Sequence, residues 1–438
     1  MNRETILPLI YEWQNIIQTK KGVERAIEPD ILITAGSKPI KIITGFRRSG
    51  KSFLVQQLAR KLIDRGIFKI DELLYLNFED YRLAEVTSPD SLGQIFELFR
   101  QVSASPAKKL IIFDEIQKVK NWDKFVRTLY EKEQVEIILT GSNSELLSAE
   151  LGSNLAGRFI EFFLLPFSFQ EFLAYKGIAV SSPEDYYRRH DEIKMLFTEY
   201  LTYGGLPEVF DILSGDARLS YLSGVLNKVV LDDVIKRFKV ENIDAIEKLL
   251  HYLLAGCGNV VSYASLSARL QAIAMKIKAE TVIAYCGYFL KTFALFELNK
   301  FSWKQSRIFG TAKKYYAVDN GLLSLYRPVA ENFSFRLENL VLVELKRRYR
   351  EICYGVSDSG WEIDFLARND ERSWDKYQVS VSLTAENEKR EMSPFAASHR
   401  FLKTGGNYLL TMDEQEGDLA YKGVAVKKMN LIRWFLNL

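Results

Sequence analysis

The sequence predicts an α/β protein whose first part is a parallel sheet flanked by helices. Short apolar runs rich in β-branched residues recur from residue 40 onward, separated by segments with apolar residues at helical spacing. A glycine-rich turn joins the first run to the helix that follows it, as phosphate-binding βα units require. With 438 residues and 47% hydrophobic content, the chain can form about two to four domains with substantial cores.

The turn at residues 45–52 fits the phosphate-binding pattern G-x-x-x-x-G-K-[ST] at every fixed position. Its residues are Gly45, Phe46, Arg47, Arg48, Ser49, Gly50, Lys51 and Ser52. A strand at 38–44 precedes it and a helix at 53–63 follows, so backbone N–H groups would face a phosphate. We expect Lys51 to reach the β- and γ-phosphates of ATP and Ser52 to bind Mg²⁺.

The segment before this loop, residues 1–35, is predicted to be a helical lead-in that packs on the nucleotide domain. Its apolar side chains fall on one helical face: Ile6, Leu9, Ile10, Trp13, Ile16 and Ile17.

A second strand is predicted at 73–78, and the next, at 109–113, runs directly into Asp114 and Glu115. Four apolar residues followed by two carboxylates form the Walker B pattern, which gains weight from the phosphate loop upstream. We expect Asp114 to complete the Mg²⁺ site and Glu115 to orient and polarise the attacking water.

The strand predicted at 135–140 ends in a Gly-Ser-Asn-Ser turn that could hold a sensor of the γ-phosphate. Thr140, Ser142 and Asn143 are the candidates, with Asn143 favoured; an ordinary turn is the alternative. Arg158 precedes an aromatic strand at 159–163. It is a candidate arginine finger for a neighbouring subunit, with an ordinary surface arginine as the other interpretation.

Six motifs occur in a fixed order along the chain: GFRRSGKS, LIIFDEIQ, ILTGSNSELL, LAGRF, LPFSFQEFL and YGGLPE. Together they resemble the prokaryotic AAA-type ATPases that carry a conserved C-terminal domain of unknown function. The resemblance covers nearly the whole chain. It implies an AAA-like core, ATP as the nucleotide and Arg158 as the arginine of the family's GR motif, but no firm cellular role.

The break at 203–207 suggests three domains: 1–205 for ATP binding, 206–330 for a helical linker and winged helix, and 331–438 for a nuclease-like domain. The middle part reads as helical from about 219 to 255. Helices at 262–270 and 278–290 and strands at 293–298 and 314–318 follow. That is the order of a winged helix-turn-helix, and the resembled family is similar here.

Residues 260–315 contain nine Lys or Arg residues and two acidic residues, a net charge of +7. This basic stretch suggests contact with DNA phosphates. Few of the basic residues lie in the predicted recognition helix, so backbone binding is favoured over base readout. A protein partner is the open alternative, because fold alone does not establish function.

The last third predicts a helix at 336–348 and strands at 352–355, 361–367 and 376–382, the order of restriction-endonuclease-like folds. Glu338 and Asp364 stand where such enzymes place Mg²⁺ ligands. Gln378 and Ser380 replace the next acid and the lysine that polarises water. We therefore expect an inactive domain kept for binding or structure, with a Mg²⁺-dependent nuclease as the least favoured alternative.

The composition of the chain argues against several other classes of protein. Three cysteines and three histidines, widely spaced, argue against a disulfide framework or a His/Cys metal site. Neither a signal-like start nor an apolar run of about 18 residues is present, so we expect a cytoplasmic protein without membrane contact. The predicted function is Mg²⁺-dependent ATP hydrolysis by a homo-oligomer, coupled to a partner. An ATP-controlled protein-interaction switch with little turnover is the alternative.

Overall fold

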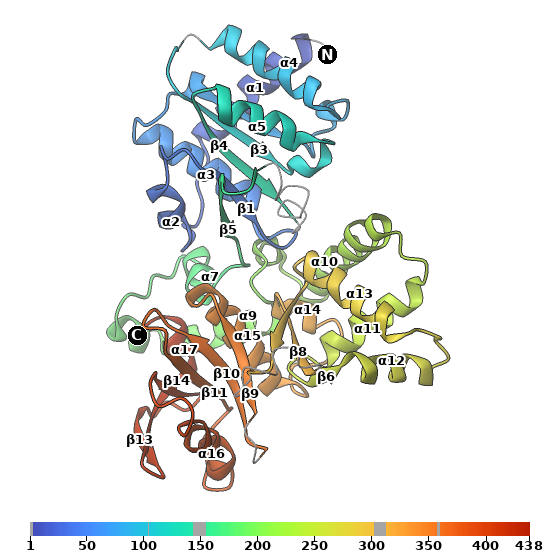
Figure 1. Ribbon diagram of the computed structural model, residues 1–438. Helices are drawn as coiled ribbons and strands as arrows, with labels where there is room; N and C mark the ends of the chain where they lie inside the picture. The colour runs from blue at the N-terminus through green and yellow to red at the C-terminus, as the bar shows by residue number, and fades with distance from the viewer. Residues whose placement is uncertain (1–2, 104, 143–154, 302–311, 357–359) are drawn as a thin grey trace. The chain divides into compact units, whose positions relative to one another are not determined.

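The computed structural model describes residues 3–103, 105–142, 155–301, 312–356 and 360–438. The chain forms two compact units, Met1–Leu164 and Leu165–Leu438 (Figure 1). The first unit holds a parallel sheet and the second a three-stranded sheet and a six-stranded mixed sheet. The predicted α/β class with a P-loop AAA-type sheet is therefore confirmed. The division into three domains at 205 and 330 stays a prediction.

Five parallel strands form the sheet of the first unit: β1 (Ile40–Thr44), β2 (Leu73–Asn77), β3 (Lys109–Asp114), β4 (Val135–Gly141) and β5 (Phe159–Phe163). Their spatial order is β2-β3-β4-β1-β5. Because β4 lies between β1 and β3, the carboxyl ends of these three strands meet at one edge of the sheet. That edge carries the phosphate loop, the two Walker B carboxylates and the end of the predicted sensor strand.

Helices cover both faces of this sheet: α1 (Arg3–Gln18), α2 (Glu28–Ile33), α3 (Lys51–Asp64), α4 (Pro89–Val102) and α5 (Trp122–Lys132). Short 3₁₀ helices occupy Ile70–Glu72, Tyr81–Leu83 and Ile116–Lys118. Along β3, Leu110 and Ile112 pack in the core that includes α3, whereas Ile111 and Phe113 pack in the core with α1, α4 and α5. Burial on both faces explains why residues 110–113 of β3 form a continuous apolar run.

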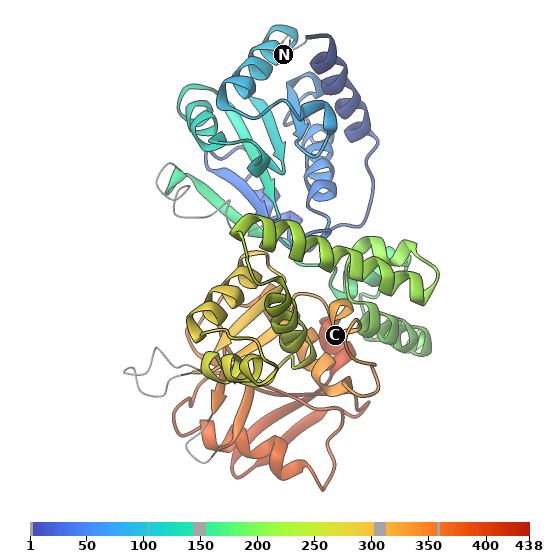
Figure 2. The same ribbon diagram turned by 90° about the vertical axis from the view of Figure 1, so that its right-hand side faces the viewer.

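The second unit begins with helices: α7 (Phe169–Tyr175), α8 (Pro183–Arg188), α9 (His190–Tyr203), the 3₁₀ helix Pro207–Asp211, α10 (Gly215–Lys228) and α11 (Ile243–Ala255). A π-helix, Val229–Lys236, continues α10 directly (Figure 2). The helical stretch expected at 219–255 is therefore present, but it is divided between α10 with its π-helix and α11.

A small antiparallel sheet with two helices follows: β6 (Val260–Ser262), α12 (Tyr263–Ala272), α13 (Ala279–Lys291), β7 (Leu295–Asn299) and β8 (Ala312–Ala317). The strand order is β6-β8-β7. Ser262 caps α12 as expected, because its side chain accepts a hydrogen bond of 3.1 Å from the N–H of Ser265. The sequence did not predict β6, which is only three residues long.

The remaining elements build the mixed sheet and its helices: α14 (Asn320–Leu323), α15 (Phe333–Arg348), β9 (Ile352–Val356), β10 (Glu362–Arg368), β11 (Trp374–Val379), α16 (Glu388–Ser398), β12 (Asn407–Thr411), β13 (Gly417–Tyr421), β14 (Val424–Asn430) and α17 (Leu431–Phe435). The sheet order is β13-β14-β12-β11-β10-β9. Strands β11, β12 and β14 are parallel, and β9, β10 and β13 run antiparallel to their neighbours.

The glycine pair at the end of α9 serves close packing. Gly204 has a φ of +77°, and a Cβ there would overlap the carboxylate of Asp319. That carboxylate accepts hydrogen bonds from the N–H groups of Gly205, at 2.6 Å, and Gly321, at 2.9 Å. Burial raises the pKa of Asp319 to about 6. The Tyr-Gly-Gly motif thus joins α9 to the turn before α14.

No helix in the described parts of the chain is both long enough and apolar enough to span a bilayer. This agrees with the absence of a long apolar run in the sequence.

Candidate active site

The phosphate loop connects β1 to α3 and depends on two glycines. A Cβ on Gly45 would overlap the backbone oxygen of Leu164, so a larger residue does not fit. Gly50 has a φ of +95°, in the left-handed region that favours glycine, and it precedes α3 without a side-chain cap. The N–H groups of the first turn of α3 are therefore left for a ligand, and the helix dipole there favours an anion.

Lys51 is buried and held against the loop. Its ammonium donates to the carbonyls of Gly45 and Phe46, both at 3.2 Å. The same Nζ lies 3.7 Å from Oε1 of Glu115. The loop lysine and the predicted catalytic carboxylate thus lie side by side at the sheet edge.

Asp114 is completely buried at the end of β3 and accepts hydrogen bonds from three hydroxyl groups. The Tyr75 hydroxyl donates to Oδ2 at 2.6 Å, and Thr140 Oγ1 donates to Oδ1. Ser52 also hydrogen-bonds this carboxylate. Burial raises the pKa of Asp114, whereas the hydroxyl groups act in the opposite direction.

Ser52 and Asp114, which the sequence assigned to Mg²⁺, are therefore in contact. Mg²⁺ prefers hydroxyl and carboxylate oxygens and keeps several waters, so one carboxylate and one hydroxyl suffice beside substrate phosphates. The oxygen atoms of Ser52 and Asp114 are therefore suitable ligands for Mg²⁺.

Glu115 follows in a left-handed conformation, with a φ of +55°. Burial acts to raise the pKa of its carboxyl, but the charges of Lys51 and Arg47 and a hydrogen bond from Gln117 outweigh it. The pKa of Glu115 is lowered. The carboxylate is therefore ionised at neutral pH and can accept a proton or a hydrogen bond from water.

Thr140 connects the two carboxylate residues. Its hydroxyl donates to Asp114 and accepts a hydrogen bond of 3.0 Å from the N–H of Glu115. Ser142 also hydrogen-bonds the Glu115 carboxylate. The end of β4 thus supports the Walker B residues. Asn143, the favoured sensor candidate, lies outside the described residues.

The remaining loop residues surround this centre. Arg47 Nη1 lies 3.8 Å from Oε1 of Glu79, and Arg48 has a φ of +67°. The Ser49 hydroxyl is buried without a hydrogen-bond partner among the described residues. Its carbonyl accepts a hydrogen bond of 3.0 Å from Arg25, which anchors the segment between α1 and α2 to the loop.

Arg158 lies at the opposite end of the sheet. Its carbonyl accepts a hydrogen bond from the N–H of Ile40, the first residue of β1, at 2.8 Å. Its guanidinium lies 3.4 Å from Oε1 of Glu131. Because the length of β1, roughly 13 Å at about 3.3 Å per residue, separates Arg158 from the phosphate loop, it is placed away from the site of its own chain.

A second group of charged residues lies in the second unit, where Glu338 and Asp364 lie near Lys314, which the sequence placed only among the basic residues of 260–315. Lys314 Nζ is 3.2 Å from Oε1 of Glu338 and 2.6 Å from Oε1 of Glu362. The Tyr316 hydroxyl donates to Glu338 at 2.6 Å. Burial, together with the charge of Glu338, raises the pKa of Asp364 far above its ordinary value.

Gln378 and Ser380 lie at the same end of β11. The side-chain oxygen of Gln378 accepts a hydrogen bond from the N–H of Asp364 at 3.4 Å. The Ser380 hydroxyl donates to the carbonyl of Ser382 at 3.0 Å. Across the described residues, no group of three or more His, Cys, Asp or Glu side chains is arranged to hold a metal ion. The cation facing Glu338 is the ammonium of Lys314.

The structure divides the basic residues of 260–315. Lys314 is buried in the carboxylate cluster, and Lys313 lies 3.1 Å from Oε1 of Glu297. Lys304 and Arg307 lie outside the described residues. Exposed among the rest are Arg269, Lys276, Lys278, Lys291 and Lys300.

Sequence reasoning missed two supporting residues. Glu362 could have been found, because residues two apart on a strand share a face and Glu362 is two residues before Asp364. Tyr75 carries no comparable signal: in the sequence it is one of several apolar residues in a buried strand, and only the register of β2 against β3 brings it near Asp114.

Comparison with known proteins concerns the family of the chain. The sequence model of a family described as "AAA domain" matches residues 37–173, and that of "Domain of unknown function (DUF8612)" matches residues 194–331. The chain is 32% identical to the uncharacterised protein MJ1544 of Methanocaldococcus jannaschii, over 86% of this chain and 83% of that protein. It is 33% identical to an uncharacterised protein of Haemophilus influenzae, over 75% of this chain and 79% of that protein.

Among solved structures, the Walker-type ATPase PABY2304 of Pyrococcus abyssi aligns with a TM-score of 0.44 and 13% identity. The alignment covers 71% of this chain and 100% of that one.

The fold and the site define the first unit as a P-loop domain of the AAA ATPase type. The chain belongs to the same family as MJ1544 and the Haemophilus influenzae protein. The AAA part of the resemblance is confirmed, and its winged-helix and nuclease-like parts stay predictions.

Proposed function

We propose that the protein binds ATP with Mg²⁺ and hydrolyses it at the edge of the parallel sheet. The convergence of Lys51, Asp114 and Glu115 carries the proposal. These residues come from two segments, the loop after β1 and the end of β3, and the strand order brings the carboxyl ends of both strands to the same edge of the sheet, on either side of β4.

Each residue of the site has a distinct role in this proposal. The uncapped N-terminus of α3 and Lys51 bind the phosphates, and Ser52 and Asp114 hold Mg²⁺. Mg²⁺ supplies neutralisation of phosphate charge when bound. Glu115, kept ionised beside Lys51, orients the attacking water and accepts its proton. Thr140 fixes both carboxylate residues in place.

Glu115→Gln tests the assignment of the base. We expect ATP binding to persist, because Glu115 is not placed on the phosphates, and turnover to fall by about 10²-fold or more. Phosphate release and binding of a fluorescent ATP analogue measure the two properties separately. The exposed Glu97 on α4 gives the control Glu97→Gln, which should leave both unchanged. Turnover that persists in Glu115→Gln shows that the base is wrongly assigned.

We further propose that Arg158 acts on the site of a neighbouring subunit in a homo-oligomer. The distance of Arg158 from its own phosphate loop supports a role between chains. Mixing Arg158→Ala with Glu115→Gln should restore turnover that each lacks alone, because some mixed sites then contain both groups. Arg127→Ala, at an exposed position of α5, is the control for losing a surface arginine. If the mixed oligomers recover no turnover, the proposed role of Arg158 between subunits is contradicted.

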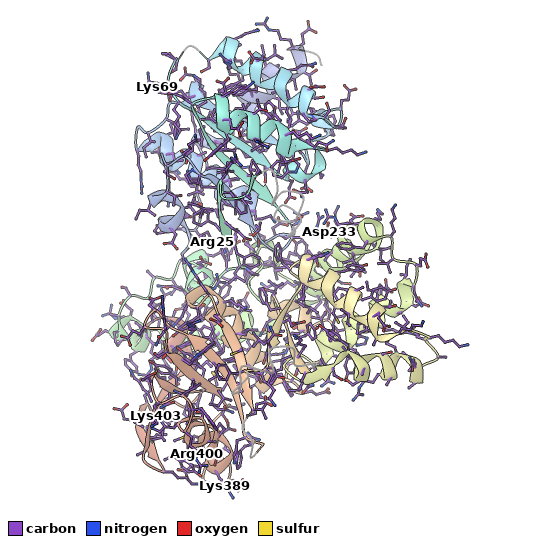
Figure 3. All side chains as sticks on the ribbon, in the orientation of Figure 1. Arg25, Lys69, Asp233, Lys389, Arg400 and Lys403 are labelled. Carbon is purple, nitrogen blue, oxygen red and sulfur yellow. The ribbon has the colours of Figure 1, made fainter. Side chains whose placement is uncertain are left out.

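DNA is the partner that we propose for the winged-helix-like segment. The order α11, β6, α12, α13, β7 and β8 supports a winged helix, and Lys276 and Lys278 are exposed just before α13. Replacing both by Gln should weaken DNA binding uniformly across sequences and lower the salt dependence by about one unit for each lysine. Lys389→Gln, at an exposed position of α16 (Figure 3), is the matched control.

A protein-interaction switch is the alternative. Slow ATP turnover that DNA does not change, together with no DNA complex at low salt, would favour it.

We infer that the nuclease-like segment is catalytically inactive and serves binding or structure. The Lys314 ammonium between Glu338 and Glu362 supports this inference, as do Gln378 and Ser380 in place of an acid and a lysine. Incubation of DNA with Mg²⁺ or Mn²⁺ should give no cleavage. Cleavage that disappears in Asp364→Ala would contradict the inference. We also propose that the protein is located in the cytoplasm.

A further inference from the structure

Tyr75 is a buried residue in the middle of β2. Its side chain is 1% exposed, and its hydroxyl is directed at the carboxylate of Asp114, 2.6 Å away. The register of the two strands pairs Tyr75 with Ile112, two residues before Asp114. Because residues two apart share a face of the sheet, the phenol projects on the face where Asp114 lies and reaches the end of β3.

The hydrogen-bond partners of the Tyr75 hydroxyl show that it donates its proton to Asp114. Gln56 of α3 donates its side-chain N–H to the Tyr75 oxygen at 2.9 Å, so the oxygen acts as acceptor there. The phenol is then the donor to Asp114 Oδ2. With Thr140 on Oδ1, each oxygen of the carboxylate has its own hydroxyl donor.

The N-terminal helix holds the tyrosine ring. Trp13 of α1 packs on Tyr75 with ring centroids 4.8 Å apart and an angle of 54° between the planes. Gln14, the next residue, donates to the carbonyl of Leu73 in the same strand at 2.8 Å. The helix that precedes the phosphate loop is thus joined to β2 at Leu73 and at the Tyr75 ring.

We propose that Tyr75 is the positioning residue that sets the orientation of the Asp114 carboxylate for Mg²⁺, and that α1 supports it through Trp13. This inference rests on the proposed ATP–Mg²⁺ function. A carboxylate held by a hydroxyl donor on each oxygen, as Asp114 is by Tyr75 and Thr140 in addition to its bond from Ser52, keeps its remaining lone pairs aimed in one direction. A carboxylate that has lost one of these donors can rotate. Partners of this kind change metal affinity by about 10- to 100-fold when they are removed.

Tyr75→Phe removes one oxygen atom and keeps the ring. Mn²⁺, followed by its paramagnetic resonance, is titrated into the full-length protein with ADP, and the ADP affinity is measured without metal. We expect Mn²⁺ to bind about tenfold or more weakly in Tyr75→Phe, with metal-free ADP affinity unchanged. Tyr81→Phe is the matched control, because Tyr81 is 85% exposed in the same unit, and it should behave as the wild type.

The outcomes separate this inference from the function on which it rests. Mn²⁺ affinity equal in Tyr75→Phe and Tyr81→Phe overturns the role of Tyr75 and leaves the ATP site standing. A wild-type protein that binds no Mn²⁺ with ADP overturns both. If Tyr75→Phe does not fold, Gln56→Met, which leaves the phenol free to turn away, must still weaken Mn²⁺ binding, and unchanged binding overturns the inference.

Discussion

The single hydroxyl group of Thr140 contacts two residues of the candidate site. It donates to Asp114, the predicted metal ligand, and accepts from the N–H of Glu115, the predicted base. One oxygen atom therefore fixes the relative position of two residues whose roles differ. The sequence named Thr140 as a sensor candidate, but it did not predict this bridge, which depends on β4 lying directly beside β3.

Replacing Thr140 by Val should reduce ATP turnover by about tenfold or more. The two side chains have nearly the same shape, so the change removes the bridge, leaves the buried N–H of Glu115 without this acceptor and deprives the Asp114 carboxylate of one hydroxyl donor. Steady-state phosphate release measures the effect. Thr128→Val on the exposed side of α5 is the control, since its hydroxyl bonds only a carbonyl of its own helix. Equal turnover in both variants would contradict the role of the bridge.

At the scale of elements, the strands of the first unit were the most predictable part. Each predicted strand exists, because fully buried parallel strands are continuous apolar runs and the loop between the first strand and its helix has a specific pattern. The contacts that join elements distant in sequence were not predictable. Tyr75 on Asp114 and Lys314 on Glu338 each depend on which strands or helices become neighbours, and single-residue patterns carry no such information.

The contact between α9 and the turn before α14 predicts a large effect for Gly204→Ala. A Cβ there would overlap Asp319, and the residue would also keep a positive φ. We expect a loss of about 3 kcal/mol or more in the free energy of unfolding. Gly177→Ala has a φ of +76° but nothing within 4 Å, so it should cost only about 1 kcal/mol for the backbone. Chemical denaturation that gives equal losses would contradict the proposed overlap.

The contact of β8 with α15 and β10 predicts the effect of Lys314→Met. Removing the ammonium leaves Glu338 and Glu362 without their buried cation, and this should cost about 3 to 5 kcal/mol. Combining the change with Glu362→Gln should recover part of the loss. Denaturation of the two single variants and the double variant measures the coupling. Additive losses would show that the pair does not interact.

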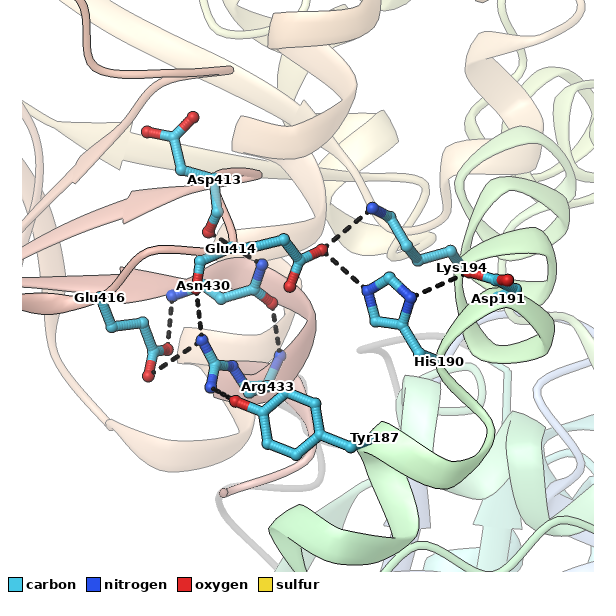
Figure 4. Close-up of polar contacts among 9 residues, drawn as sticks. All are labelled: Tyr187, His190, Asp191, Lys194, Asp413, Glu414, Glu416, Asn430 and Arg433. Carbon is cyan, nitrogen blue, oxygen red and sulfur yellow. Dashed lines mark hydrogen bonds and ion pairs between the residues drawn. The ribbon is translucent and has the colours of Figure 1, made fainter.

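At the scale of the whole molecule, the second unit carries a network between α8 and α9 and the C-terminal strands and α17 (Figure 4). His190 lies between Glu414 and Asp191, with a ring nitrogen 3.0 Å from each carboxylate. Lys194 is 2.9 Å from the same oxygen of Glu414. Arg433 of α17 donates to the Tyr187 hydroxyl at 2.6 Å. Segments more than 200 residues apart in the sequence are joined here.

This network predicts a pH window of stability. Hydrogen bonds to Glu414 and Asp191 raise the pKa of His190, so its contribution is complete below about 6.5 and is lost as pH rises through the folded-state value. Burial acts to raise the pKa of Glu414, but His190 and Lys194 lower it overall. Its contribution is present above about 4.5 and is lost as pH falls. Both contribute together between these values.

His190→Gln should therefore lower the melting temperature more at pH 5.5 than at pH 8. The corresponding difference in the free energy of unfolding is small, about 0.2 to 1 kcal/mol, because the ion pair is partly exposed. Thermal unfolding at the two pH values measures it, with His399→Gln as the control because His399 belongs to the same unit and lies outside this network. A loss that is the same at both pH values would contradict the ion pair.

The candidate active site depends on the phosphate loop, since its other residues in the first unit bind or act on a nucleotide held there. Phosphate release from ATP and Mg²⁺ by the full-length wild type, Lys51→Ala and Lys69→Ala tests it most directly. Lys69 is exposed on the same unit (Figure 3) and controls for the loss of a lysine. We predict turnover in the wild type and in Lys69→Ala, and a loss of about 10²-fold or more in Lys51→Ala, because the loop lysine neutralises phosphate charge. Equal turnover in all three proteins, or none in the wild type, would contradict the account.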